Sequence, residues 1–421
     1  MNIMKALAYL FLLFAAPAMA QDLGNIEKSR IIDSISQKLK ALYVYPEVAE
    51  QMSKQLHSNA EKGQYAKIKN PNAFADRLTT DLLAVCHDKH LGVHYDPRPV
   101  QNHPIMEDNV ELARSRNFGF KELKILDGNI GYLNLSYFEA TGKGGETATM
   151  AMNFLSNADA LIIDLRMNGG GSTDMVQLLA SYLFEGEPQP LTDIYWRPTN
   201  TLIQFKTLPY VQGKRMPHKD VYVLTSQNTF SAAEDFCYSL QNLKRITIIG
   251  ETTGGGAHPV EEIAASDHFI ISIPEGRSIS TITKTDWEGT GVKPDVPVPA
   301  KDALLTAQLK ALTKAPEDNF PAKWALMTIK AKLSPVTVSS DSLKVYTGTY
   351  GERKIFLENG QLYLEKTGGA KNHLIPMDKD LFSVEDKDYL RIKFVRKDAV
   401  ITGFTRLFDD GTAEPGVKDI Q

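Results

Sequence analysis

The chain has 421 residues, of which 43% are hydrophobic and 23% charged. This composition is typical of globular proteins and excludes collagen-like, coiled-coil and largely disordered chains. At about 150 residues per domain, the length predicts two or three domains. Lys and Arg total 47 against 51 Asp and Glu, a net charge of −4. Because no basic excess is present to neutralise phosphates, we expect no nucleic-acid partner.

The first twenty residues have the pattern of a secretory signal peptide. Lys5 supplies a positive charge, residues 6–16 are apolar, and Ala18-Met19-Ala20 offers small residues for cleavage. The apolar run is too short to cross a bilayer, although a retained N-terminal anchor is the alternative. The sequence therefore predicts cleavage after Ala20, a periplasmic or secreted protein, and no membrane span once the signal is removed.

Hydrophobic periodicity predicts helices first and an α/β core after them. Apolar residues at helical spacing predict about three helices within residues 25–86, and strand-like alternation begins at Leu91. From Ile130, short β-branched runs alternate with amphipathic segments, which is typical of a mainly parallel sheet. The expected strands are 130–135, 160–165, 221–225 and 246–250, and the expected helices are around 145–156, 173–184 and 231–242.

The last part of the chain changes to antiparallel character. Residues 268–280 are predicted to form a hairpin through Pro274-Glu275-Gly276, and helical segments are expected after Pro299. Residues 355–365 contain two alternating runs around Asn359-Gly360, which is a strong hairpin signal. We therefore expect a small antiparallel β domain, either a barrel or a compact sandwich, over residues 340–415.

Two loops at strand ends carry residues that are suited to acyl-transfer chemistry. Ser231 follows the strand that ends at Thr225 and opens a helix, where backbone N–H groups and the helix dipole favour a developing oxyanion. The Ser231-x-x-Glu234 spacing also fits a capping box, so this segment alone leaves both roles open. The NGGG run, residues 168–171, exposes bare backbone and predicts either an oxyanion hole or a tight turn.

Histidines and an acid-containing loop complete the candidate residues. The segment 87–94 contains His87, His90 and His94, which fit a general base, a metal pair, or histidines of surface or core. Gly92 and the start of strand alternation argue against the single helix that a metal pair would need. Residues 286–298 place Glu288 beside an aromatic residue in a glycine-rich loop, which fits a carboxylate in a cleft or a simple turn.

Together, these segments resemble the C-terminal processing, or tail-specific, serine peptidases, in the branch of the tricorn core and the interphotoreceptor-retinoid-binding-protein-like domains. Each motif is weak alone, but their order and spacing over residues 25–305 make the resemblance strong. The motifs are DKHLGV (88–93), GNIGYLNL (128–135), DLRMNGGGS (164–172), TFSAAEDF (229–236), GETTGGGA (250–257) and WEGTGVKPDVPV (287–298).

The resemblance implies a role for each matching residue. Ser231 matches the nucleophile, His90 the general base and Glu288 the acid that completes the relay. The amide of Ala232, with one from Gly169 or Gly170, matches the oxyanion hole. The implied function is an exported serine peptidase without cofactor or metal that acts on peptides or unfolded protein. The alternative is a non-catalytic binder of hydrophobic ligands or peptides on the same scaffold.

The sequence departs from the family pattern at three places. Gly256 stands where the Ser–Lys members have their lysine, which favours the His/Glu version of the mechanism. Lys89 replaces the serine that precedes the histidine in the tricorn-like branch, and is a possible relay residue or alternative base. About 35 residues separate His90 from the first core strand, too few for the PDZ domain with which tail-specific members capture C-termini.

The resemblance also implies the fold, an α/β protein with a crotonase-like (ClpP-like) core of ββα units arranged as a superhelix. A helical domain precedes this core and an antiparallel β domain follows it. Cys86 and Cys237 are predicted either to pair or to remain as buried free thiols. The expected division is signal peptide 1–20, N-terminal helical domain 21–105, peptidase core 106–305, helical linker 306–339 and β domain 340–421.

Overall fold

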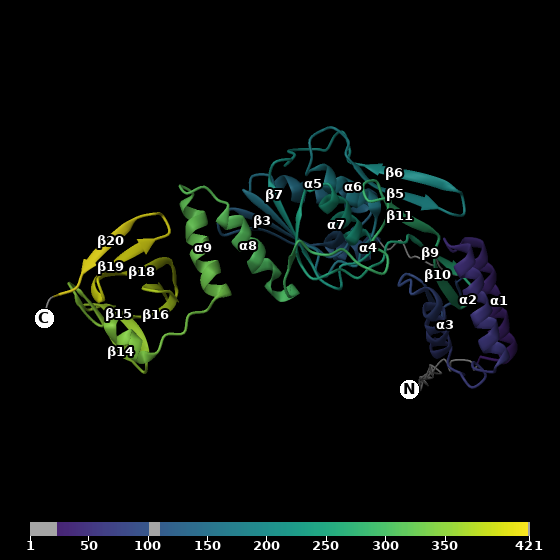
Figure 1. Cartoon of the computed structure of the whole chain (residues 1–421), viewed down its shortest axis with the longest axis horizontal. Helices are drawn as coiled ribbons and strands as arrows, with labels where there is room; N and C mark the ends of the chain where they lie inside the picture. The colour runs from purple at the N-terminus through teal and green to yellow at the C-terminus, as the bar shows by residue number, and fades with distance from the viewer. Residues whose placement is uncertain (1–22, 101–109, 420–421) are drawn as a thin grey trace, which may run out of the picture. The chain divides into compact units, whose positions relative to one another are not determined.

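The computed structural model describes residues 23–100 and 110–419, so the expected signal peptide lies outside the described residues (Figure 1). The chain divides into two compact units. The N-terminal unit contains the described residues before 109 together with Trp196–Thr201 and His258–Arg277, and the second unit contains the others. Within the described ranges, no helix combines the length and the apolar character that crossing a membrane requires.

The N-terminal unit combines three helices with a small antiparallel sheet. The helices bury apolar side chains at helical spacing, including Ile35, Leu56 and Phe74. Phe74 packs edge-on against Phe269 of the sheet, with ring centroids 5.9 Å apart. The elements are α1 (Asn25–Leu42), α2 (Pro46–Glu61), α3 (Pro71–Cys86), and the strands β1 (Gly92–Tyr95), β10 (Phe269–Pro274) and β9 (Val260–Ala264), in the order β1-β10-β9.

A six-stranded mixed sheet forms the centre of the second unit, in the order β12-β8-β7-β4-β3-β2. Only β2 runs antiparallel to its neighbour, and the other pairs are parallel. The α/β character of the prediction is confirmed. The strands are β2 (Phe120–Leu126), β3 (Ile130–Leu135), β4 (Ala160–Asp164), β7 (Asp220–Thr225), β8 (Thr247–Gly250) and β12 (Val296–Pro297).

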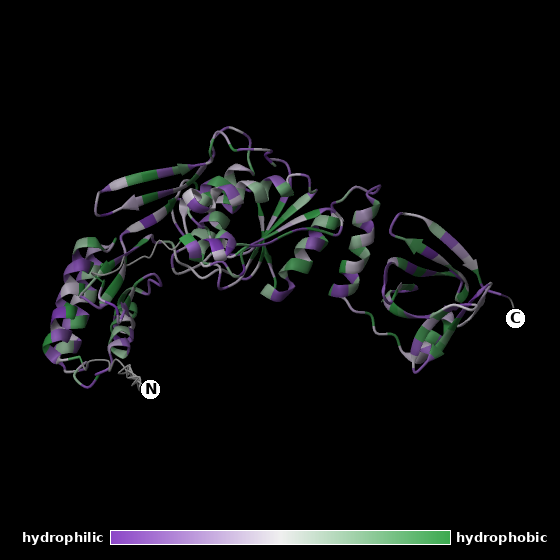
Figure 2. Ribbon diagram, turned by 180° about the vertical axis from the view of Figure 1, so that it is seen from behind, coloured by the Kyte–Doolittle hydropathy of each residue, from purple (hydrophilic) through white to green (hydrophobic). Residues whose placement is uncertain are grey.

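Alternating side chains of these strands serve two hydrophobic cores. On β4, Leu161 and Ile163 enter the core under α5, α6 and α7, whereas Ala160 and Ile162 enter the core under α8 and α9. The central strands are therefore hydrophobic along most of their length (Figure 2). The helices are α5 (Thr141–Leu155), α6 (Thr173–Ser181), α7 (Ala232–Asn242), α8 (Ala303–Thr313) and α9 (Phe320–Leu333), with the short α4 (Val110–Ser115) before β2.

The C-terminal part is an eight-stranded meander in which every neighbouring pair is antiparallel. The antiparallel β domain is thus confirmed, and the expected hairpin turns at Asn359 and Gly360, which both have positive φ. After α10 (Ser340–Leu343), the strands are β13 (Gly348–Tyr350), β14 (Arg353–Glu358), β15 (Gln361–Lys366), β16 (Lys371–Asp378), β17 (Leu381–Val384), β18 (Lys387–Lys397), β19 (Val400–Phe408) and β20 (Ala413–Val417).

The hairpin that was expected over residues 268–280 is wrong. Two strands form there, but β10 pairs with β1 and β9, whereas β11 (Gly276–Ser280) joins β5 (Pro190–Trp196) and β6 (Thr201–Lys206) in another sheet. Glu275, the one residue between β10 and β11, carries the chain from one sheet to the other. The alternation of apolar and polar residues predicted the two strands but not the strands with which they pair.

Phe382 tests the core of the meander, because it is completely buried against the rings of Tyr346 and Phe394. Phe382→Ala should lower the free energy of unfolding by about 3–5 kcal/mol, since it leaves a cavity. Tyr389→Ala, at a residue that is 49% exposed, is the control and should change it by less than about 0.5 kcal/mol. Urea denaturation measures both, and equal effects would contradict this core.

Candidate active site

Ser231 occupies a strained position at the start of α7. It follows the loop after β7 and is the N-cap residue, with φ 54° and ψ −123°. Positive φ is uncommon for a residue with a Cβ, and such strain persists only where the surrounding structure enforces it. Strained residues of this kind cluster at active sites, so the backbone marks Ser231 independently of its chemistry.

The NGGG loop packs directly against this serine. The amide of Phe230 donates to the carbonyl oxygen of Asn168 at 3.0 Å, which joins the two loops. A Cβ added at Gly170, where φ is 111°, would lie 2.7 Å from the Cβ of Ser231. Glycine at this position is therefore required by both conformation and space. The structure brings together the serine and the glycine loop that the sequence indicated.

The three candidate oxyanion amides lie in different surroundings. Gly170 is buried, and its amide donates to the side-chain oxygen of Asn168 at 2.9 Å. Gly169 is exposed, with open space where its Cβ would be. Ala232, at the first position of α7, is 7% exposed. Since the amide of Gly170 already has an acceptor, the amides of Gly169 and Ala232 are better placed to donate to a further ligand.

Glu234 fixes the main chain of Ser231 from within the protein. Its fully buried carboxylate accepts the amide of Ser231 at 2.9 Å, and its own amide donates to the carbonyl oxygen of Ser231 at 2.8 Å. The capping-box interpretation is therefore correct for the main chain of Ser231. The carboxylate also accepts the amides of Gly255 and Gly256, at 2.7 and 2.8 Å, and the hydroxyl of Thr253.

Gly256 is linked to the serine segment through its main chain. Its amide, rather than a side chain, reaches toward the serine segment, and it does so through the Glu234 carboxylate. Burial raises the pKa of Glu234, and the hydrogen bonds from Thr253 and the backbone amides counteract this.

Glu288 is anchored to the same glycine segment. The amide of Ala257 donates to Glu288 Oε2 at 2.6 Å, and the indole of the buried Trp287 donates to the carbonyl oxygen of Gly256 at 2.8 Å. Glu288 itself is partly buried. Within the second unit, hydrogen bonds thus link both residues to the segment 255–257. Glu288 binds it directly, and Ser231 is linked to it through the carboxylate of Glu234.

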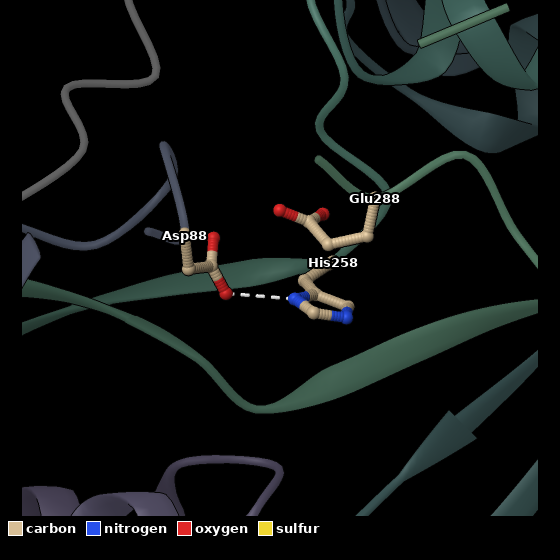
Figure 3. Close-up of side chains that lie close together, drawn as sticks. All are labelled: Asp88, His258 and Glu288. Atoms are coloured by element: carbon tan, nitrogen blue, oxygen red, sulfur yellow. Dashed lines mark hydrogen bonds and ion pairs between the residues drawn. The ribbon is translucent and has the colours of Figure 1, made fainter. Parts of the chain in front are cut away.

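The third candidate, His90, lies in the N-terminal unit beside a buried carboxylate. Asp88 is 2% exposed, and its Oδ1 accepts the amide of His90 at 3.1 Å. Its Oδ2 lies 2.7 Å from Nδ1 of His258, which is 3% exposed (Figure 3). The hydroxyl of Tyr43 also donates to Oδ2, at 3.3 Å. One carboxylate therefore connects two histidines that are far apart in the sequence.

His90 is in a state suited to accept a proton. Its side chain is 8% exposed, and burial lowers its pKa to about 4, although the charge of Asp88 acts in the opposite direction. The imidazole is therefore neutral at pH 7. Lys89, the neighbouring residue, is exposed.

The cysteines are free thiols, which decides between the two alternatives that the sequence left open. Burial raises the pKa of both Cys86 and Cys237, so neither is an activated thiolate.

Two residues of this region were not identified from the sequence, Asn168 and His258. Asn168 is completely buried; its side chain donates to the carbonyl oxygen of Leu135 at 2.9 Å and thereby holds the NGGG loop on β3. His258 directly follows the GETTGGGA segment (250–257), and that adjacency was the available signal. Its partner Asp88 is 170 positions away, so the pair could not be found by local spacing.

Glu234 provides a test of this framework. Glu234→Gln should lower the free energy of unfolding by about 2–3 kcal/mol, because an amide group would turn N–H donors toward backbone N–H groups. Glu187→Gln makes the same chemical change at an exposed site and should be neutral. Urea denaturation of the two variants measures the difference. An equally small effect of both would show that the buried carboxylate does not hold these loops.

Comparison with known proteins identifies the family. Residues 129–298 match Peptidase family S41, and residues 24–118 match the N-terminal domain of Peptidase_S41 in eukaryotic IRBP. The chain is 25% identical over 177 residues to the carboxyl-terminal-processing peptidase 2, chloroplastic, of Arabidopsis thaliana, covering 40% of this chain and 32% of that protein. It is 28% identical over 192 residues to the carboxy-terminal-processing protease of Bartonella bacilliformis, covering 42% and 41%.

The chain thus spans about a third to two fifths of the length of these curated relatives. A solved structure, that of the photosystem II D1 C-terminal processing protease, aligns with a TM-score of 0.43 and 15% identity, covering 65% of this chain and 93% of that one. The two family matches cover consecutive parts of the chain, in the order of the two domains. The chain belongs to peptidase family S41.

Proposed function

We propose that this protein is an exported serine peptidase in which Ser231 is the nucleophile, His90 the general base and Glu288 the acid that completes the relay. The observation that carries the proposal is the strained backbone of Ser231 at the N-terminus of α7, against which Gly170 packs. Family membership supports the same reaction class. A serine that served only as a helix cap would not need positive φ.

The reaction proceeds through an acyl-enzyme. The Ser231 oxygen forms a bond to the peptide carbonyl carbon while His90 takes the hydroxyl proton. Collapse of the tetrahedral intermediate breaks the C–N bond, and His90 gives that proton to the leaving amine. Water then attacks the ester while His90 takes a proton from it. The bond between the acyl carbon and the Ser231 oxygen breaks, and His90 returns the proton to that oxygen. Because burial lowers the pKa of His90, its ring is neutral at pH 7, which is the form that accepts a proton.

The negative oxygen of the intermediate is held by the amides of Ala232 and of Gly169 or Gly170. The N-terminus of α7 adds the positive end of a helix dipole. A single donor of this kind is worth about 2.7–4 kcal/mol of the barrier. Of the two glycines, Gly169 is favoured, because the amide of Gly170 bonds to Asn168.

We further propose a crotonase-like core of ββα units, with peptides or unfolded protein as substrates. The expected leader, residues 1–20, supports a periplasmic or secreted location. Recognition of C-terminal tails, to which the relatives' names refer, is not included, since the segment after His90 is too short for a PDZ domain. Lys89 is the alternative base.

Labelling by a fluorophosphonate tests the nucleophile. The wild-type protein should be labelled and should cleave an unfolded protein, whereas Ser231→Ala should lose labelling and more than about 1,000-fold in hydrolysis. Ser339→Ala is a matched control, since Ser339 is also an N-cap serine but caps α10 with its side chain. Mass spectrometry of the labelled peptide locates the modified residue. Wild-type protein that is neither labelled nor active would favour the non-catalytic binder.

A second experiment separates His90 from Lys89. His90→Ala should keep its fold but lose hydrolysis by about 100-fold or more, because general-base assistance is removed. Lys89→Ala should change the rate less than about threefold if the lysine only faces solvent. Steady-state kinetics on the same unfolded substrate compare the two variants. Full activity of His90→Ala together with inactive Lys89→Ala would assign the base to the lysine.

A further inference from the structure

We propose that His258 is a positioning residue for the candidate base His90 and acts through the carboxylate of Asp88, an inference that rests on the proposed function. The three residues belong to the N-terminal unit. Asp88 gives one oxygen to the main chain of His90 and the other to the ring of His258. The carboxylate is therefore shared between a histidine that it positions and a histidine that compensates its charge.

The geometry determines which nitrogen of His258 carries the proton. An ionised carboxylate only accepts hydrogen bonds, so Nδ1, at 2.7 Å from Asp88 Oδ2, is the donor. Nε2 lies 3.5 Å from the hydroxyl of Tyr45, which stands edge-on to the ring. His258 is thus held at both nitrogens, with its donor directed at Asp88.

The proton affinity of His90 depends on the charge of this carboxylate. Its Nδ1 lies 3.9 Å from Asp88 Oδ1, which is too far for a hydrogen bond but close enough for a strong charge interaction. The charge of Asp88 raises the proton affinity of His90, and His258 lowers it. Loss of His258 would leave a buried carboxylate with fewer donors, and His90 would bind a proton more tightly.

Within the N-terminal unit, the other titratable groups around Asp88 do not replace this effect. Tyr43 after α1 and Cys86 at the end of α3 both face Asp88, and burial raises the pKa of both, so both are uncharged at pH 7. In the same loop, His87 and Lys89 are exposed, so solvent screens them. Within the N-terminal unit, His258 makes the shortest of the contacts to the Asp88 carboxylate, at 2.7 Å.

The pH dependence of fluorophosphonate labelling tests this inference. In His258→Ala, the acidic limb of the labelling rate should move to higher pH by about one unit or more, with recovery at higher pH. His258→Asn keeps a neutral N–H donor toward Asp88 and should restore most of the wild-type profile. His94→Ala removes an exposed histidine of β1 and should leave the profile unchanged. In an Asp88→Asn background, replacing His258 should have no further effect on the limb.

Two results would overturn the inference. One is an unchanged acidic limb in His258→Ala. The other is loss of labelling at every pH in both His258 variants while circular dichroism shows a folded chain, since His258 would then take the proton itself. If the wild-type protein is not labelled at all, the proposed function fails first. The inference is then judged by NMR titration of the His90 ring, whose pKa should rise in His258→Ala and stay constant in His94→Ala.

Discussion

The arrangement around Ser231 depends on one buried carboxylate. Glu234 is completely buried, yet its oxygens accept bonds from the amides of Ser231, Gly255 and Gly256 and from the hydroxyl of Thr253. An ionised group in such a place is tolerated only if its hydrogen bonds replace the lost water. The donors come from the turn before α7 and the segment after β8, so satisfying this charge fixes the distance between two loops that carry the candidate site.

The sequence predicted the secondary structure of the core well, because burial on both faces makes parallel strands continuous and apolar. It predicted pairing less well. The β10–β11 hairpin was wrong because Pro274-Glu275-Gly276 has turn composition, while the partners of both strands come from distant segments. By contrast, the hairpin at Asn359-Gly360 was confirmed, because its partner strands are neighbours and the turn residues themselves determine the register.

The difference between contacts of neighbouring segments and contacts of distant segments also explains how much of the site could be predicted. Ser231 and the NGGG loop follow neighbouring parallel strands, whose carboxyl ends share one edge of the sheet, so their proximity could be expected. The bond between Asp88 and His258 depends on β9 and β10 joining β1 in the N-terminal unit. That pairing is non-local, and a single histidine after a glycine run gave no reason to expect it.

The strain at Ser231 follows from these constraints. A positive φ at a residue with a Cβ costs about 1–3 kcal/mol. Here the cost is offset by the charge-assisted bond that the amide of Ser231 donates to the carboxylate of Glu234. Gly170 packs closely against the serine, because a Cβ added at this glycine would lie 2.7 Å from the Cβ of Ser231. The serine is thus held in place by its main chain, through the bonds of its amide and carbonyl groups with Glu234.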